Sequence, residues 1–163
     1  MNTTEEFDIK KPTGGMLYGS TKTYDFNTGF SCCFRQWRAQ SHCRFLHGYA
    51  LKFHFKFLSG QLDERNWAVD FGSLKSLKGW LEFMFDHTTL VALDDPLIDT
   101  FRELHVVKMI DLREVVATGC EATARLVYEY TEQWLKDNGY EHIELGRVSV
   151  HEHSGNSAFY GFF

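Results

Sequence analysis

With 163 residues, of which 44% are hydrophobic and 24% charged, the chain is long enough to form one domain with a buried core. A formal net charge of −5 without a long basic run gives no electrostatic reason to expect binding to nucleic acid or to an anionic membrane. No apolar stretch is long enough to span a membrane, and the polar N-terminus is unlike a signal peptide, so we expect a cytoplasmic protein with a small-molecule ligand.

Two strands are predicted in the first part of the chain. Residues 1–23 contain Pro12 and several glycines among polar side chains, which indicates an N-terminal arm or tail before a single domain at residues 24–163. Large side chains alternate with smaller or polar ones over residues 24–35, which is the period of a half-buried strand. The alternation is clearest over residues 47–57, where one face carries His47, Tyr49, Leu51, Phe53, Phe55 and Phe57.

Two helices are predicted next. Asp70 is in position to cap a helix whose apolar residues recur every three or four positions and which ends near Asp86. Thr118 and Glu121 have the spacing of a capping box at the start of a second helix, which Gly139 ends. Glu121 therefore receives a structural role.

Residues 143–152 and 157–162 are predicted to form two further strands, joined by a turn at residues 154–156. The order of elements is then strand, strand, helix, helix, strand, strand (ββααββ). This order predicts an α+β fold, with an antiparallel four-stranded sheet and two helices on one face. Because the sheet is rich in aromatic residues, we expect its other face to be covered by oligomerisation.

Three segments form a spaced pattern that resembles one known family. The first segment, Cys43 to Tyr49 (CRFLHGY), is similar to a Cys-x-x-x-His-Gly-His motif. The second comprises residues 69–75 (VDFGSLK), similar to an Asp-Phe helix start, and residues 85–87 (FDH), similar to an Asp-His pair. The third, residues 148–152 (VSVHE), is similar to a strand that bears a glutamate. All three occur in the 6-pyruvoyltetrahydropterin / 6-carboxytetrahydropterin synthase family. The resemblance extends from about Phe26 to Tyr160.

This resemblance implies a fold, an assembly and a reaction. The fold is the tunnelling fold (T-fold), in which the sheets of several subunits join into a barrel, and the family suggests a homo-oligomer, a hexamer, with active sites between subunits. The substrate would be 7,8-dihydroneopterin triphosphate, which loses its triphosphate while its side chain rearranges. The product in the bacterial branch is 6-carboxytetrahydropterin, on the way to queuosine and other 7-deazaguanines.

The resemblance also implies catalytic roles for Cys43, Asp86 and His87. Cys43 stands at the family's catalytic cysteine, whose thiolate moves protons on the side-chain carbons of the substrate. Asp86 and His87 match a pair in which the carboxylate orients the imidazole for acid–base chemistry, and in the family this pair reaches the cysteine from a neighbouring subunit. The alternatives are a loop cysteine that only packs and a helix C-terminal histidine that interacts with the helix dipole.

Glu152 matches the carboxylate that accepts two hydrogen bonds from the amino and N–H edge of a pterin. The alternative is a solvent-exposed glutamate at a strand end, where glutamate is common. Strand alternation turns His151 and His153 away from Glu152, so both are predicted to be structural or surface residues.

The family's zinc is held by three histidines, one on the first strand and two at alternate positions of the second. Of these His47 is retained, whereas Phe34 and Tyr49 stand at the other two ligand positions. Since zinc sites use at least three protein ligands, His42 or Cys43 would have to help His47 complete the site. The sequence therefore leaves open a rebuilt zinc site, with His47 and His42 as metal ligands, and the absence of metal.

Two functions follow from these observations. The first is a lyase that acts on a reduced pterin and forms 6-carboxytetrahydropterin or 6-pyruvoyltetrahydropterin. The second is a metal-free, non-catalytic paralogue that binds a pterin or purine ring, or a subunit of a larger complex that does so.

Overall fold

The structure is a computed structural model that describes residues 17–162. This part of the chain forms seven strands and three α-helices, together with two short 3-10 helices at Phe26–Thr28 and His42–Arg44. The strands are β1 (Tyr18–Tyr24), β2 (Phe30–Phe34), β3 (His47–Ser59), β4 (Thr88–Ala92), β5 (Leu112–Val115), β6 (Glu144–His153) and β7 (Asn156–Gly161). The helices are α1 (Lys75–Phe85), α2 (Ile98–Val106) and α3 (Cys120–Asp137).

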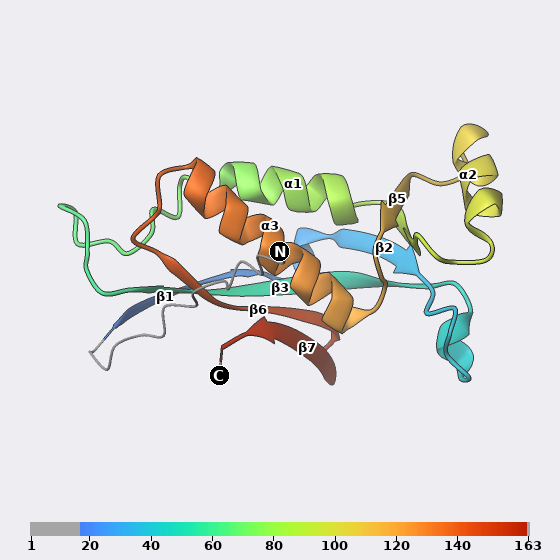
Figure 1. The fold of residues 1–163 in the computed structure, drawn as a ribbon, viewed down its shortest axis with the longest axis horizontal. Coiled ribbons are helices and arrows are strands. Elements are labelled where there is room, and N and C mark those ends of the chain that lie inside the picture. Colours follow the sequence, from blue (N-terminus) through green and yellow to red (C-terminus); the bar gives the residue numbers. More distant parts are fainter. Residues whose placement is uncertain (1–16, 163) are drawn as a thin grey trace, which may run out of the picture.

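The sheet is organised around β3, its longest strand (Figure 1). The first part of β3 pairs with β2 and its second part with β1, while β6 pairs along its other edge and β7 pairs with β6, all antiparallel. β4 then pairs with β2, and β5 with β4, in parallel. The α+β class and the T-fold arrangement are thus confirmed, but the sheet is mixed and larger than the four antiparallel strands that the sequence predicts.

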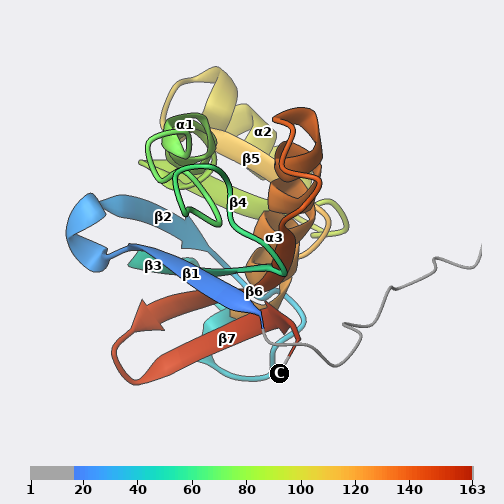
Figure 2. The same cartoon turned by 90° about the vertical axis from the view of Figure 1, so that its left-hand side faces the viewer.

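The aromatic face of β3 forms the core of the domain. Phe53, Phe55 and Phe57 are fully buried, whereas the alternating residues Lys52, His54 and Lys56 are half-buried on the opposite face. Figures 1 and 2 show α1 and α3 lying side by side over one face of the sheet. Burial of each phenylalanine side chain stabilises the fold by roughly 1.5–3 kcal/mol.

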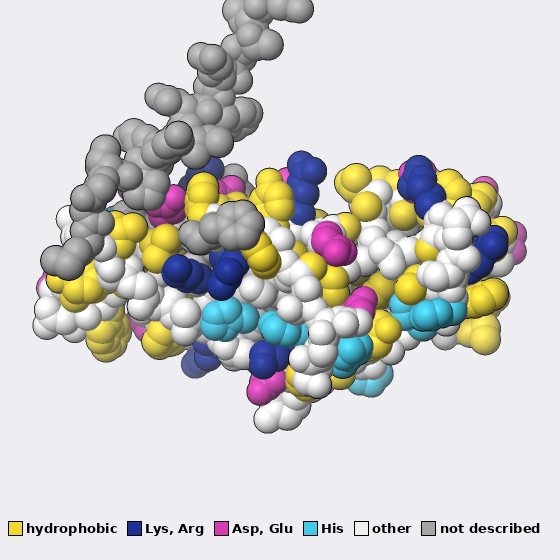
Figure 3. Space-filling model, turned by 90° about the horizontal axis from the view of Figure 1, so that it is seen from below, with side chains coloured by type: hydrophobic (Ala, Val, Ile, Leu, Met, Phe, Trp, Pro, Cys, Tyr) yellow, Lys and Arg dark blue, Asp and Glu magenta, His cyan; other side chains and the backbone are white. Residues whose placement is uncertain are grey.

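This packing corrects the argument for oligomerisation. The aromatic residues are covered by the chain's own helices, so they do not need a second copy to bury them. The opposite face is polar, and Figure 3, which views the molecule from that side, shows histidine and basic side chains across it. Among residues 17–162, no helix is long and apolar enough to cross a membrane.

The segment between α1 and α3 contains three elements that the sequence does not predict, namely β4, α2 and β5. Every residue of β4 is buried, because the strand lies inside a parallel part of the sheet. Such strands show a continuous apolar run instead of alternation, and four or five residues are too few to distinguish a strand from a helix.

Both predicted helix caps differ from the structure. α1 begins at Lys75, and the Asp70 carboxylate instead accepts a hydrogen bond from the backbone N–H of Gly72 at 2.8 Å in a tight turn. α3 begins after Gly119 without a side-chain cap, because the Thr118 hydroxyl donates to the carbonyl of Arg35 at 2.7 Å. The predicted ends are confirmed, since α1 stops at Phe85 and Gly139 follows α3 with a positive φ of 77°.

The first predicted strand is divided by the 3-10 helix at Phe26–Thr28. Of the predicted N-terminal arm, residues 1–16 lie outside the described residues. Tyr18–Tyr24 form β1, which pairs with β3 from Ser59 to Phe53. The predicted boundary at residue 24 therefore falls at the end of a strand and does not separate an arm from the domain.

Candidate active site

An aromatic cluster lies where β2 ends and β3 begins. Phe34 on β2 is paired with His47 on β3, and their ring centroids are 5.1 Å apart. The Tyr49 ring lies 6.2 Å from Phe34 and 5.5 Å from His47. Gly48 between them is needed for this close approach, since a Cβ there would be 3.0 Å from the carbonyl oxygen of Cys32.

His47 also fixes the loop that precedes it. Its Nδ1 lies 2.7 Å from the carbonyl oxygen of Phe45, and because a carbonyl only accepts, Nδ1 carries the proton. Cys43 lies in the short 3-10 helix of the same loop, where its carbonyl accepts from the backbone N–H of Gln36 at 2.9 Å. The Cys43 side chain is half-buried, and all four cysteines of the chain are free thiols.

Glu152 approaches this cluster from β6. Burial raises the pKa of Tyr49, and the charge of Glu152 raises it further, so Glu152 is within electrostatic range of the tyrosine. The pairing of β6 with β7 is irregular between His151 and His153, which places Glu152 in a bulge. A bulge re-aims a side chain and is common beside active sites.

The bulge also moves His153, which strand alternation places on the opposite face from Glu152. Its ring centroid lies 6.2 Å from that of Tyr49, so His153 belongs to the edge of the same cluster. The sequence gives no signal for this position, because a bulge shifts the alternation by one residue without changing residue types.

Cys120 is a second residue that the sequence leaves without a role. It opens α3, and its buried thiol donates a weak hydrogen bond to the Val150 carbonyl at 3.8 Å. Burial raises the pKa of Cys120 to about 12, with further contributions from the charges of Glu152 and Glu121 and from a hydrogen bond to the Glu152 side chain. The thiol therefore stays protonated beside Glu152.

Asp86 and His87 form the predicted carboxylate–imidazole pair directly after α1. The distance from Asp86 Oδ1 to His87 Nδ1 is 2.6 Å, and since a carboxylate accepts, the proton lies on Nδ1 and leaves Nε2 as a base. The His87 side chain is 87% exposed. Its backbone φ of 56° lies in the left-handed region, where helix ends usually place glycine.

The pair and the cysteine stay apart within one chain. β4 begins at Thr88, which pairs with Cys32 on β2, and Cys32 pairs in turn with Tyr49 on β3, so β2 separates the two halves of the site. Among residues 17–162, no hydrogen bond, ion pair or ring contact joins Asp86 or His87 to Cys43.

The residues around His47 do not fit a three-ligand metal site. Within the described part of the chain, no three His, Cys, Asp or Glu side chains are grouped so that they could hold a metal ion. Phe34, at the first ligand position of the family's zinc, is buried against the His47 ring. His42 is exposed in the loop, and its role as a metal ligand with His47 stays a prediction.

Comparison with known proteins supports the resemblance. The sequence model of the 6-pyruvoyl tetrahydropterin synthase family matches residues 23–161. A search of curated protein sequences finds no significant match.

Three solved structures illustrate the similarity of fold. An uncharacterised protein of Wolinella succinogenes, WS1659, has a TM-score of 0.76 at 19% identity, covering 90% of this chain and 99% of its own. A catalytic-residue mutant of Plasmodium vivax 6-pyruvoyltetrahydropterin synthase gives 0.65 at 11% identity, with coverages of 90% and 98%. The Caenorhabditis elegans synthase gives 0.57 at 14% identity, with coverages of 90% and 94%. At these identities the structures support the fold alone.

Proposed function

Because the chain belongs to the 6-pyruvoyl tetrahydropterin synthase family, whose members are lyases, we propose that it acts as a lyase on a reduced pterin bound at the start of β3. The observation that supports this most directly is the Asp86–His87 pair, which is hydrogen-bonded, exposed and held in a backbone conformation unfavourable for histidine. Outliers of this kind cluster at functional sites, because the surrounding structure must hold them in place.

Glu152 would hold the pterin ring. A carboxylate accepts two hydrogen bonds from the adjacent amino and N–H groups of the ring, which matches the geometry of that edge. Tyr49 and His153 lie beside it, with ring centroids 6.2 Å apart, and give a flat substrate aromatic neighbours. The protonated Cys120 thiol lies beside Glu152, close enough for the Glu152 charge to raise the pKa of the thiol.

Cys43 and the Asp86–His87 pair would transfer protons. The Cys43 thiolate removes or returns a proton on the side-chain carbons of the substrate, and His87 Nε2 acts as the partner base or acid. Since β2 separates the two groups within one chain, the pair would be supplied by a neighbouring copy in a homo-oligomer, a hexamer as the family resemblance suggests.

The finer assignment is that 7,8-dihydroneopterin triphosphate is the substrate and 6-carboxytetrahydropterin or 6-pyruvoyltetrahydropterin the product. We place this reaction in the cytoplasm, in or near 7-deazaguanine and queuosine biosynthesis. For 6-pyruvoyltetrahydropterin, loss of the triphosphate and proton transfer on the side chain would suffice. For 6-carboxytetrahydropterin, water must also add and a carbon–carbon bond of the side chain must break, with the other two carbons leaving as acetaldehyde.

A second candidate function is favoured by the aromatic cluster. Because the described residues supply no third metal ligand near His47, the protein could have kept ring binding through Glu152 while losing metal-dependent turnover. It would then be a metal-free binding protein for a pterin or purine ring, or a subunit of a larger complex. Because the described residues form no such metal site, the lyase mechanism above uses no step at a zinc ion.

One experiment separates these functions. Purified protein is incubated with 7,8-dihydroneopterin triphosphate, substrate loss and triphosphate release are followed by chromatography, and bound metal is measured in the same sample. The lyase function requires substrate consumption that falls at least about 100-fold in Cys43→Ala, the scale of acid–base catalysis. Binding of neopterin without turnover, lost in Glu152→Gln, would support the binding function. Both functions would be refuted if the protein showed no turnover and no binding.

A further inference from the structure

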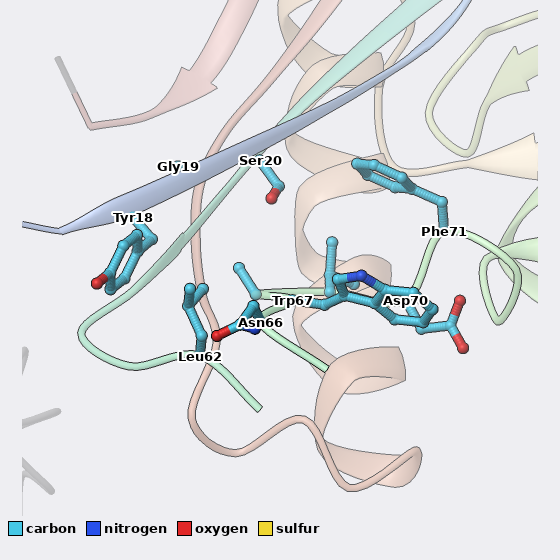
Figure 4. A pocket seen from close by; sticks show the side chains of 10 residues that line it. Tyr18, Gly19, Ser20, Leu62, Asn66, Trp67, Asp70 and Phe71 are labelled. Atoms are coloured by element: carbon cyan, nitrogen blue, oxygen red, sulfur yellow. The ribbon is translucent and has the colours of Figure 1, made fainter. Parts of the chain in front are cut away.

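A cavity lies at the far end of β3, between β1 and the loop that leads to α1. Its volume is about 480 Å³, which is within the range of small-molecule pockets. Figure 4 shows Tyr18 and Ser20 of β1 on one side and Leu62, Asn66, Trp67 and Phe71 of the loop on the other. Tyr18, Trp67 and Phe71 are 52%, 45% and 49% exposed, so three aromatic rings border this space with much of their surface uncovered.

Trp67 is held in a fixed position at this cavity. The Asp63 carboxylate accepts from the backbone N–H of Trp67 at 2.9 Å, and the Asp63 N–H donates to the Trp67 carbonyl at 2.9 Å. The Arg65 guanidinium covers the Trp67 ring, 4.3 Å from its centroid, and Arg65 does not line the cavity. One face of the indole is therefore packed while the rest of it borders the cavity.

The polar groups at the cavity favour an uncharged ligand with donors and acceptors. The side chains of Asn66 and Ser20 and the Trp67 indole N–H make no hydrogen bond with the described residues, so they are available to a ligand. Among the described residues that line the cavity, the charged one is Asp70, and its carboxylate already has partners. Its Oδ1 accepts from Gly72 at 2.8 Å, and its Oδ2 lies 3.7 Å from the Arg65 guanidinium.

The cavity is separate from the candidate active site. β3 runs from His47, in the aromatic cluster, to Ser59, which pairs with Tyr18 at the cavity. At about 3.3 Å per residue the two sites lie roughly 40 Å apart. Tyr18, Gly19 and Ser20 also precede residues 23–161, which match the family.

We propose that this cavity is a second binding site, for a flat, uncharged heteroaromatic ring of purine size. The ring stacks on the part of the Trp67 indole that Arg65 does not cover, and the donors and acceptors of the ring pair with Asn66 and Ser20. A base stacked on an aromatic side chain gains affinity with little dependence on its identity, and the polar side chains then select among rings.

Adenosine and guanosine are suitable probes, because both are uncharged and carry a purine ring. Binding to the full chain is measured by calorimetry, and contact is measured by nuclear Overhauser effects between the purine protons and the Trp67 indole. The expected result is saturable binding of at least one nucleoside with these contacts. Trp67→Ala should weaken binding about tenfold or more, the scale of base stacking, whereas Trp67→Phe should retain most of it.

Two control variants make the result specific. Phe83→Ala removes another exposed aromatic residue, 60% exposed and outside the cavity, and should leave binding unchanged. Glu152→Gln alters the candidate active site, where guanosine could also bind, and should leave the nuclear Overhauser contacts with Trp67 unchanged. The proposal is overturned if neither nucleoside binds saturably, if Trp67→Ala binds like the unmodified protein, or if Glu152→Gln abolishes the contacts with Trp67.

Discussion

His87 combines a proposed catalytic role with an unfavourable backbone conformation, so one substitution should affect stability and activity in opposite ways. Its φ of 56° follows the last turn of α1, where glycine has no steric penalty. We predict that His87→Gly leaves the protein as stable as before or slightly more stable, while lyase activity falls by at least about 100-fold through loss of the acid–base group.

The magnitude follows from three contributions to the free energy of unfolding. Relief of the left-handed conformation gains roughly 1–2 kcal/mol. The greater freedom of glycine in the unfolded chain costs about 0.4–1 kcal/mol. The contact between His87 and Asp86 is exposed, and exposed polar pairs contribute about 0–1 kcal/mol. The net change therefore lies between about −1 and +1.6 kcal/mol, with a midpoint near +0.3 kcal/mol, which corresponds to roughly 1 °C in Tm for a domain of this size.

Lys108→Gly is the matched control, because Lys108 has a φ of 61° and lies outside the candidate site. This variant should stabilise the protein by up to roughly 1.6 kcal/mol, with a midpoint near 0.8 kcal/mol, without changing turnover. Urea unfolding and turnover are measured on both variants. If His87→Gly loses more than about 1 kcal/mol while Lys108→Gly is stabilised, the Asp86 contact outweighs the strain and our reasoning on stability is wrong. Unchanged turnover in His87→Gly would remove the pair from the chemistry.

Three further predictions concern the ring site, the metal and pH. Glu152→Gln should weaken binding of neopterin by about tenfold or more in calorimetry, because the amide repels one of the two ring donors; unchanged affinity would place the ring elsewhere. Phe34→His combined with Tyr49→His should bind close to one zinc per chain after dialysis, measured by elemental analysis, and equal zinc in the unmodified protein would contradict the loss of the site. Burial and neighbouring cations lower the pKa of His54 and His151 below 6.5, so the folded protein binds fewer protons than the unfolded chain, and the free energy of unfolding should fall as the pH drops below 6.5. Replacing both with glutamine should flatten that dependence in urea titrations between pH 7 and 5, and an unchanged slope would show that other groups cause it.

The sequence predicts the antiparallel half of the fold well and the parallel half poorly. β3 and β6 have one buried and one wetter face, so their side chains alternate and the predicted strands agree with the structure. β4 has no solvent-exposed face, and its five buried residues do not alternate between hydrophobic and polar side chains. The caps fail for a different reason, since Thr118 has the right spacing but its hydroxyl bonds to Arg35, a contact across 83 positions of the chain.

The same distinction applies to the candidate site. The Asp86–His87 contact joins neighbours in the chain, so the sequence can predict it. The approach of Cys120 to Glu152 depends on how α3 packs on β6. The position of His153 beside Tyr49 depends on a bulge that cannot be predicted from the residue types around it. Local contacts follow from spacing, whereas these two require the three-dimensional packing.

The aromatic cluster gives a physical reason for a histidine at position 47, beside Phe34 and Tyr49. A metal would join β2 to β3 through its ligands, and here the rings of Phe34, His47 and Tyr49 make that connection, at about 0.5–1.5 kcal/mol for each aromatic pair. A phenylalanine at position 47 would also fill this space, but it could not donate to the Phe45 carbonyl. That hydrogen bond ties His47, at the start of β3, to the end of the loop that carries Cys43.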